Sequence, residues 1–455
     1  MLKQDADFLS SAKTSSSDGV NRPIMVDPMS MVKRFYAALG ANMTGQVMTT
    51  LIQLVTVPAF LYCWSLSEYG SWLILTAVPA YFALSDIGFL AVTINKMTIV
   101  AASGDTEKVN ILFQTAFKLC QTAALAGTLL ALIVVFSLNV KPLDSLTSKA
   151  VLVILVFSAV LAMSSGLLDA VFRSSGEFAL GMHLVNGARF IEWIGMLCGL
   201  FLGRTFLSTA IGQLAGRLVA SLIGWKIASR RYPNIQWGVS KASAQELREM
   251  ARPALSFMAF PVANAVNIQG MTLVVGHLFG VAFLAIFSTY RTLTRILVQA
   301  VTIIGRSLWP EISRRFGVGD MRVLVDLYRK GTFASIGLAA GLCFFLYYFG
   351  ETLLHLWTRG RIPFEKSMFD LFLVAAMITS FWQMGMVLLA ATNRHPRLSI
   401  TYLLGSIMSI LVTYTFSGVA GTQAPMIGLI GFEVFLVVMC SVHVRAFKRN
   451  MQVAI

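Results

Sequence analysis

The chain has 455 residues, of which 56% are hydrophobic and only 13% are charged, and its mean hydropathy is +0.73. Soluble domains carry about 25% charged residues, so this composition excludes an ordinary water-soluble surface. The formal charge of +15 does not indicate nucleic-acid binding, because the basic residues lie mainly in short connectors between apolar runs, as in membrane proteins. We therefore expect an integral membrane protein with no nucleic-acid partner.

The N-terminal segment 1–37 is polar and lacks the apolar core of a cleaved signal peptide, so we expect a disordered cytoplasmic tail. After it, apolar runs of about 20 residues recur, each long enough to cross a hydrocarbon core of about 30 Å. They predict an all-α membrane protein with about twelve transmembrane helices. The expected ranges are 38–61, 70–94, 111–137, 150–172, 180–203, 205–228, 254–278, 283–308, 331–356, 369–391, 398–418 and 424–445.

The longest connector, 229–253, divides these helices into an N-lobe of six (38–228) and a C-lobe of six (254–445), followed by a short tail, 446–455. The second part of the connector alternates charged and apolar residues with helical spacing. It predicts a short amphipathic helix at the membrane surface.

An internal repeat supports the division into two halves. Gly104-Asp105 follows the second helix, and Gly319-Asp320 follows the eighth, about 215 residues later. Each half begins on the same side of the membrane. The repeat is therefore parallel, with an axis along the membrane normal, which favours two lobes around a central cavity with alternating access.

The connectors are unequally charged. One set is rich in basic residues, including Lys33, Arg34, Arg230, Arg231, Arg314, Arg315, Arg329, Lys330, Lys448 and Arg449. The opposite set holds only Lys141, Lys149, Arg204, Arg359, Arg361 and Lys366. The positive-inside rule places the first set, with both termini, in the cytoplasm.

The eighth expected helix carries a basic stripe. Arg291, Arg295, Gln299, Thr302 and Arg306 are spaced to fall within one ~80° wedge over about 20 Å. A charged group at the centre of a membrane helix is costly, so such residues usually face a cavity. The alternative is that Arg291 and Arg295 pair with membrane carboxylates for structure alone.

Other polar residues also lie at membrane depth. The first helix carries Asn42, Gln46 and Gln53 on one face, which suits either a polar lumen or hydrogen bonds between helices. The seventh contains Pro261, Asn264 and Asn267, a combination that predicts a bent helix lining a cavity. The remaining buried bases are Lys118, Arg189 and Arg217. The acids are Asp86, Glu192 and Glu433, each of them either a proton carrier or a fixed counter-ion.

The buried bases outnumber the acids, so we expect Arg291, Arg295, Arg217, Arg189 and Lys118 to converge on a cationic lumen. Arginine binds phosphate through paired donors and stays charged at any working pH, which favours a phosphate-bearing substrate. The sequence holds no Walker A loop, HExxH or nucleophile elbow, and its scattered His and Cys form no metal motif. We therefore expect a transporter with no cofactor, not an enzyme.

Short motifs add a family resemblance over residues 36–445. They are Glu68-Tyr69-Gly70 before the second helix, Ser85-Asp86-Ile87-Gly88 within it, Gly104-Asp105, Leu308-Trp309-Pro310-Glu311-Ile312-Ser313 and Gly319-Asp320. In this order and spacing the chain resembles the polysaccharide transporter branch, the Wzx-type flippases, of the multidrug/oligosaccharidyl-lipid/polysaccharide (MOP) superfamily. The resemblance implies two six-helix lobes and a cationic cavity.

The same resemblance implies a function: translocation of undecaprenyl-pyrophosphate-linked oligosaccharide across the bacterial inner membrane for surface polysaccharide synthesis. Membrane lipids and polysaccharide polymerase or assembly proteins would be its partners. The alternative is a multidrug exporter of the same superfamily that expels organic cations. A cation site calls for excess acid and aromatic faces. The buried charges here are net basic, which argues against such a site.

A third possibility is a non-transporting membrane subunit that anchors a polysaccharide assembly complex. Such a subunit would not need the buried charges.

Overall fold

The structure is a computed structural model that describes residues 28–82, 87–137, 145–392, 394 and 396–452. In its first half the helices are α2 (Pro28–Cys63), α3 (Leu66–Phe82), α4 (Ile87–Ala102), α5 (Thr106–Ser137), α6 (Leu146–Ser174), α7 (Phe178–Gly203) and α8 (Phe206–Arg231). The second half contains α9 (Ala244–Ala265), the π-helical segment η1 (Val266–Gly270), α10 (Met271–Phe279), α11 (Val281–Val318), α12 (Met321–Thr358), α13 (Lys366–Ala391), α14 (Pro396–Ala420), the 3-10 turn η2 (Gly421–Gln423) and α15 (Ala424–Gln452).

Each expected transmembrane segment coincides with a helix, and the predicted all-helical class is confirmed. Two segments are each made of more than one helix: the second consists of α3 and α4, and the seventh of α9, η1 and α10. Within the described residues, nine helical stretches are long and apolar enough to cross a membrane, with α14 and α15 counted as one stretch. The protein is therefore a multi-pass membrane protein.

Helices α11 and α12 are longer than their apolar runs predict. Each has 38 residues, about 57 Å at 1.5 Å per residue, against a hydrocarbon core of about 30 Å. The extra turns of α11 are polar. Glu311 pairs with Arg315 at 2.7 Å, and Arg315 also reaches Asp320 at 3.2 Å. Such pairs stabilise a helix extension that projects into water. An apolar pattern does not predict such an extension, because its residues are polar.

The repeated Gly-Asp pair has the same role in both halves. Gly104 and Gly319 both have a φ of 81°, a left-handed conformation that favours glycine. The following aspartates then accept backbone N–H groups of the next helix: Asp105 from Lys108 at 2.9 Å, and Asp320 from Val323 at 3.2 Å. The motif therefore ends one helix and caps the next.

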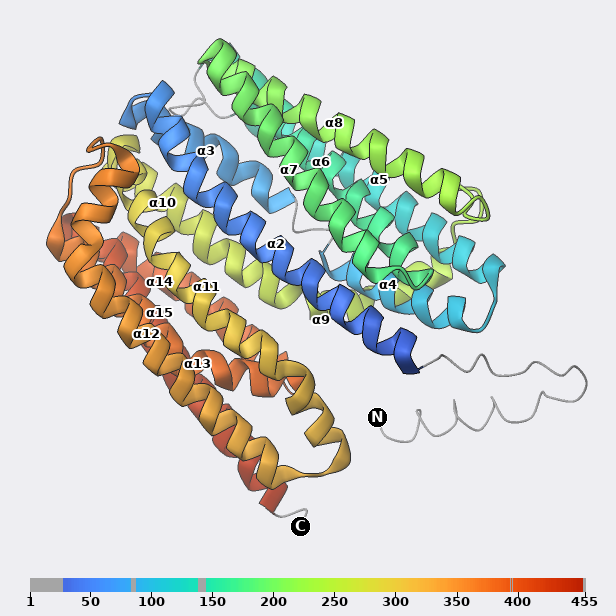
Figure 1. Cartoon of the computed structure of the whole chain (residues 1–455). Coiled ribbons are helices and arrows are strands. Elements are labelled where there is room, and N and C mark those ends of the chain that lie inside the picture. The colour runs from blue at the N-terminus through green and yellow to red at the C-terminus, as the bar shows by residue number, and fades with distance from the viewer. Residues whose placement is uncertain (1–27, 83–86, 138–144, 393, 395, 453–455) are drawn as a thin grey trace, which may run out of the picture.

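The helices form two bundles that meet at one end (Figure 1). Helices α2–α8 make up the N-lobe, and α10–α15 make up the C-lobe. At the end away from the start of α2 and the end of α15, one apolar core spans both lobes and joins Phe60, Trp64 and Trp72 to Leu284 and Tyr290. Toward the chain ends each lobe has an apolar core of its own.

The connector between the lobes is docked on the N-lobe. Asn110 donates to the Asn234 carbonyl at 3.0 Å and accepts the Gln236 N–H at 2.7 Å, and Gln114 accepts the Lys241 N–H at 2.7 Å. The amphipathic stretch expected as a separate surface helix is instead continuous with the membrane helix, because α9 runs unbroken from Ala244.

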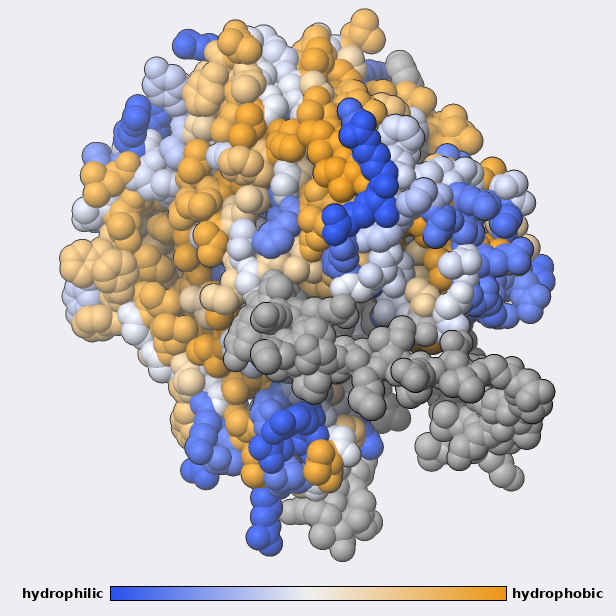
Figure 2. All heavy atoms as spheres, turned by 45° about the vertical axis from the view of Figure 1, so that its right-hand side comes forward, coloured by the Kyte–Doolittle hydropathy of each residue, from blue (hydrophilic) through white to orange (hydrophobic). Residues whose placement is uncertain are grey.

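The surface of the molecule is predominantly apolar, as a membrane protein requires. In Figure 2 hydrophobic residues cover most of the visible face, and hydrophilic residues gather toward its edges. Hydrophilic side chains also interrupt the apolar surface near the middle of this view. Large exposed side chains such as Phe344 (67%) and Leu404 (55%) would face lipid.

Candidate functional site

A cavity of about 490 Å³ lies among the helices of the C-lobe. Its walls come from α9, η1, α11, α13, α14 and α15, so the cavity lies within one lobe and not between the two. Most of its lining is apolar. The polar and aromatic residues around it are Asn264, Asn267, Arg291, Thr294, Arg295, Trp309, Phe372, Thr379, Trp382, Gln383, Tyr402, Phe432 and Glu433. This volume is typical of ligand pockets, which span about 300–1,000 Å³.

Arg291 lines the cavity and also binds the adjacent helix. Its guanidinium donates to the Ile268 carbonyl at 3.1 Å and to the Thr272 hydroxyl at 2.9 Å. Phe287, one turn earlier on α11, lies under the same group at 5.2 Å from the ring centroid. Arg291 is therefore held by neutral partners.

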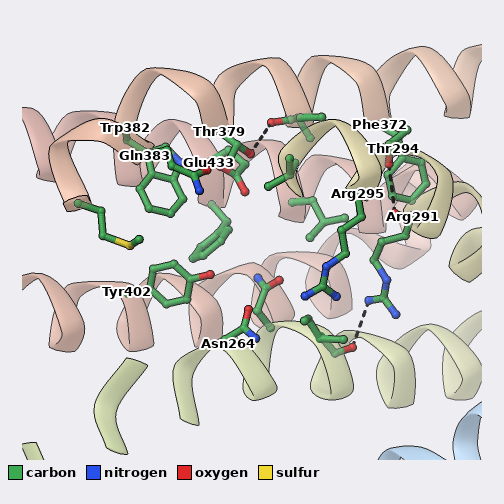
Figure 3. Close-up of a pocket in the computed structure, with 18 of the residues that line it drawn as sticks. Asn264, Arg291, Thr294, Arg295, Phe372, Thr379, Trp382, Gln383, Tyr402 and Glu433 are labelled. Carbon is green, nitrogen blue, oxygen red and sulfur yellow. Dashed lines mark hydrogen bonds between the residues drawn. The ribbon is translucent and has the colours of Figure 1, made fainter. Parts of the chain in front are cut away.

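Arg295 lies one turn further along α11 and faces the same cavity. Figure 3 shows both guanidinium groups pointing toward the helix that carries Asn264. Among the residues that the structure describes, no carboxylate lies within ion-pair distance of either arginine. Two buried like charges repel each other, so this part of the cavity is electrostatically suited to an anion.

The opposite part of the cavity is different in character. Glu433 of α15 accepts a hydrogen bond from the Trp382 indole N–H at 2.7 Å, and Tyr402 and Phe432 line the same region. In Figure 3, Trp382, Glu433 and Tyr402 lie together, apart from Arg291 and Arg295. The cavity therefore has a basic end and an end with one acid among aromatic rings.

The basic residues of the N-lobe do not reach this cavity. Arg217 of α8 forms a buried ion pair with Glu192 of α7, which also accepts from Gln213 at 3.0 Å and Ser158 at 3.3 Å. Buried charges need such partners. The pairing of Glu192 with Arg189 that their spacing suggests is not found among the described ion pairs.

Several predicted site residues lie elsewhere. Lys118 and Arg189 are exposed on α5 and α7, so the structure does not bring them together with the α11 arginines. Asp86 and the side chain of Asn42 fall outside the described residues. A single cationic lumen built from both lobes is therefore not what this structure shows.

The polar stripe of the first helix instead faces α11 across the lobe interface. Gln299 donates to Gln53 at 2.8 Å and accepts from Thr50 at 2.9 Å. Nearer the chain ends, Arg306 donates to Gln46 at 3.2 Å. We call these contacts the α2–α11 seam; in it the amides join the lobes and do not line the cavity.

Trp382, Gln383 and Tyr402 are cavity residues that the sequence pattern did not single out. They carry no charge at neutral pH, so the cost of burying charge does not mark them. A weak signal exists in Thr379 and Gln383, which lie one turn apart on an otherwise apolar helix. No group of His, Cys, Asp or Glu in the described part of the chain is arranged to hold a metal.

Comparison with solved structures identifies the architecture. One structure, described as the inward-facing conformation of a multidrug resistance MATE family transporter of the MOP superfamily, matches with a TM-score of 0.73 at 14% identity. The match covers 88% of this chain and 96% of that one. The chain has the MATE fold. No protein-family model and no curated protein sequence matches it.

Two further solved structures resemble the chain less closely. The outward-facing conformation of a multidrug resistance MATE family transporter matches with a TM-score of 0.58 at 14% identity, over 94% of this chain and 97% of that one. A MOP superfamily transporter from Pyrococcus furiosus also scores 0.58, at 13% identity, over 96% and 99%. Its description states that reverse polarity of its binding pocket suggests a different function.

Proposed function

We propose that this protein is a transporter that moves a negatively charged, lipid-linked molecule across a membrane by alternating access. The C-lobe cavity would hold the headgroup. The observation that carries the proposal is Arg295, a guanidinium in a largely apolar cavity with no carboxylate partner among the described residues. Such a charge is costly unless a ligand neutralises it.

Phosphate is the anion that fits this end of the cavity best. A guanidinium can bind two phosphate oxygens at once through parallel N–H donors, and Arg291 supplies a second cation one turn away. The cavity volume suits the headgroup of a lipid and not its long chain. The substrate we propose is undecaprenyl-pyrophosphate-linked oligosaccharide, flipped across the bacterial inner membrane for surface polysaccharide synthesis with both termini in the cytoplasm.

The shape of the molecule supports alternating access. The lobes share an apolar core at one end and have separate apolar cores toward the other. With the termini in the cytoplasm, the end with separate cores would be the inner one. The chain also scores higher against an inward-facing MATE structure, 0.73, than against an outward-facing one, 0.58.

Export of organic cations is the second candidate, and Glu433 favours it. The carboxylate lies among Trp382, Tyr402 and Phe432, and an acid with aromatic faces is the usual site for an organic cation. The MATE neighbours described as multidrug resistance transporters point the same way. Against this candidate, the arginines outnumber the acid in the same cavity.

Ligand binding by the purified protein separates the two candidates. Farnesyl pyrophosphate serves as the anionic probe and tetraphenylphosphonium as the cationic one. We expect saturable binding of the pyrophosphate, weakened about 10-fold or more by Arg295→Gln, because a hydrogen bond to a charged group contributes about 1.5–3 kcal/mol. Saturable binding of the cation alone, lost in Glu433→Gln, would establish the second candidate instead.

A gene deletion tests the substrate in the cell. We expect the deletion to accumulate lipid-linked oligosaccharide on the cytoplasmic side and to lose surface polysaccharide, and the wild-type gene but not Arg295→Gln to restore it. Unchanged polysaccharide together with increased sensitivity to cationic drugs would overturn the flippase proposal.

A further inference from the structure

The seventh membrane segment passes from one lobe to the other. The first half of α9 packs on the N-lobe, where Met250 and Ala254 share a core with Met97 and Leu112. Its later turns, η1 and α10 pack mainly against α14 and α11 of the C-lobe, and η1 and α10 also contact α3. Figure 1 shows the segment running behind α2 between the two bundles. Any change in the angle between the lobes must therefore bend this segment.

The segment has one place suited to bending. Residues Val266–Gly270 form a π-helical turn, in which the regular i→i−4 backbone bonds are interrupted. Such turns inside α-helices frequently occur at functional sites. The π-helical turn ends at Gly270, whose small size admits Ile410 of α14 and Tyr81 of α3 at close range.

Arg291 of α11 holds this turn in shape. The Ile268 carbonyl lies in the π-helical turn and accepts from the Arg291 guanidinium at 3.1 Å. Thr272, on the first turn of α10, donates to the same carbonyl at 2.8 Å and accepts from Arg291 at 2.9 Å. One side chain therefore fixes the interrupted turn and the helix that follows it.

The same guanidinium faces the cavity that Arg295 lines. Asn267, inside the turn, also lines the cavity, and its side-chain amide nitrogen is buried with no hydrogen-bond partner among the described residues. An anion in the cavity would offer both groups an acceptor. The Ile268 carbonyl is a neutral acceptor, whereas a phosphate oxygen carries charge of the opposite sign and can pair with a guanidinium through two parallel bonds, so it would compete well with the carbonyl.

We propose that Arg291 is a positioning residue that couples anion binding to bending of the seventh segment at Val266–Gly270. In the empty cavity it holds the π-helical turn. A bound anion draws the guanidinium away and releases the turn, so that the lobes can change their angle. The coupling to a ligand rests on the proposed function. The restraint of the turn by Arg291 does not.

Distance measurements between the lobes test the coupling. Spin labels at Ser103→Cys and Val318→Cys, both exposed and on opposite lobes near the chain ends, report the separation there. The full-length protein would be studied in lipid nanodiscs with its five native cysteines replaced. Farnesyl pyrophosphate is the probe, and size-exclusion chromatography confirms that each variant is folded.

We expect Arg291→Gln to change the distance distribution of the ligand-free protein and Arg291→Lys to restore it in part, because lysine donates but cannot span both acceptors. Thr272→Val, which leaves all charges in place, should change it in the same direction. Arg295→Gln should leave the ligand-free distribution unchanged and remove the response to the probe. A ligand-free distribution of Arg291→Gln and Thr272→Val identical to wild type would overturn the proposal.

The two proposals fail in different ways. If the wild type does not respond to farnesyl pyrophosphate while Arg291→Gln still changes the ligand-free distribution, the turn is restrained by Arg291 but an anion is not its ligand. If the wild type binds the probe and the distribution never moves in any variant, the site stands and the coupling is refuted.

Discussion

Arg217 and Glu192 form an ion pair between α8 and α7 in which the side chains are only 7% and 15% exposed. The N-lobe thus neutralises its buried arginine internally, whereas the C-lobe leaves Arg295 without a carboxylate partner among the described residues. The two lobes therefore differ in how they accommodate a buried arginine. In the proposed function, the N-lobe charge supports structure and the C-lobe charge meets a ligand.

The Arg217–Glu192 pair should be required for stability but not for binding. Removing one partner of a buried pair costs about 3–5 kcal/mol, so we expect Arg217→Ala to lower the thermal midpoint by about 3–5 °C. The double variant Arg217→Leu with Glu192→Leu should recover most of that loss, because no buried charge is left unpaired. Thermal unfolding in detergent measures both. Loss of farnesyl pyrophosphate binding in the folded double variant would contradict the structural role.

Gly70 of α3 lies against the backbone of Val281 at the closed end of the molecule. A Cβ added at this glycine would lie 1.8 Å from the Val281 carbonyl oxygen, which cannot move without its helix. Gly70→Ala should therefore force the lobes apart and disfavour this conformation by about 1–3 kcal/mol. Spin labels at Ser67→Cys and Ser367→Cys would show a longer distance. Gly337→Ala, where nothing lies within 4 Å of the added Cβ, is the matched control.

The α2–α11 seam should stabilise the same conformation more weakly. Gln299→Leu removes its bonds to Gln53 and Thr50, and each bond between helices in a bilayer contributes about 0.6 kcal/mol. We expect this conformation to lose about eightfold in relative population, measured with the Ser103 and Val318 label pair. Thr332→Val, which removes a bond within α12 only, should have no effect. Equal distributions for both variants would show that the seam does not hold the lobes.

A surface contact at the end of α8 should make stability depend on pH. Hydrogen bonds from Arg231, at 2.8 Å, and from Tyr232 lower the pKa of Glu177 below its ordinary value of 4.5. The folded state thus binds this proton more weakly than the unfolded state, so the contact stabilises above the ordinary pKa and is lost as pH falls through the folded pKa. Glu177→Gln should therefore lower the thermal midpoint at neutral pH and much less near pH 3. An equal difference at both values would exclude this linkage.

The helices were predictable because each apolar run must cross the bilayer. The helix ends that the sequence did not predict lie outside the apolar runs, where hydrophobicity no longer marks the helix. The extension of α11 past residue 308 contains Pro310, Glu311 and two arginines, which end the apolar pattern although the helix continues. The docking of the connector depends on Asn110 and Gln114, whose partners lie more than 100 residues away in sequence.

Part of the site could also be predicted. The cost of burying charge marks Arg291, Arg295 and Glu433, and all three line the cavity. The same reasoning does not reveal partners on other helices, so it grouped Arg217 with the cavity residues. Trp382 and Tyr402 give no such signal, because aromatic side chains are common in membrane helices.

Because the connector and the first turns of α9 are anchored on the N-lobe, the covalent tether between the halves runs through the hydrophobic interior. In a protein whose two halves are joined by a flexible loop, each half could move as an independent rigid body. Here a change in the angle between the lobes would be transmitted through the continuous helices of the seventh segment. Their π-helical turn, which lies beside the cavity, would be the point that bends. The substrate site and the point of bending would thus lie at the same place in the molecule.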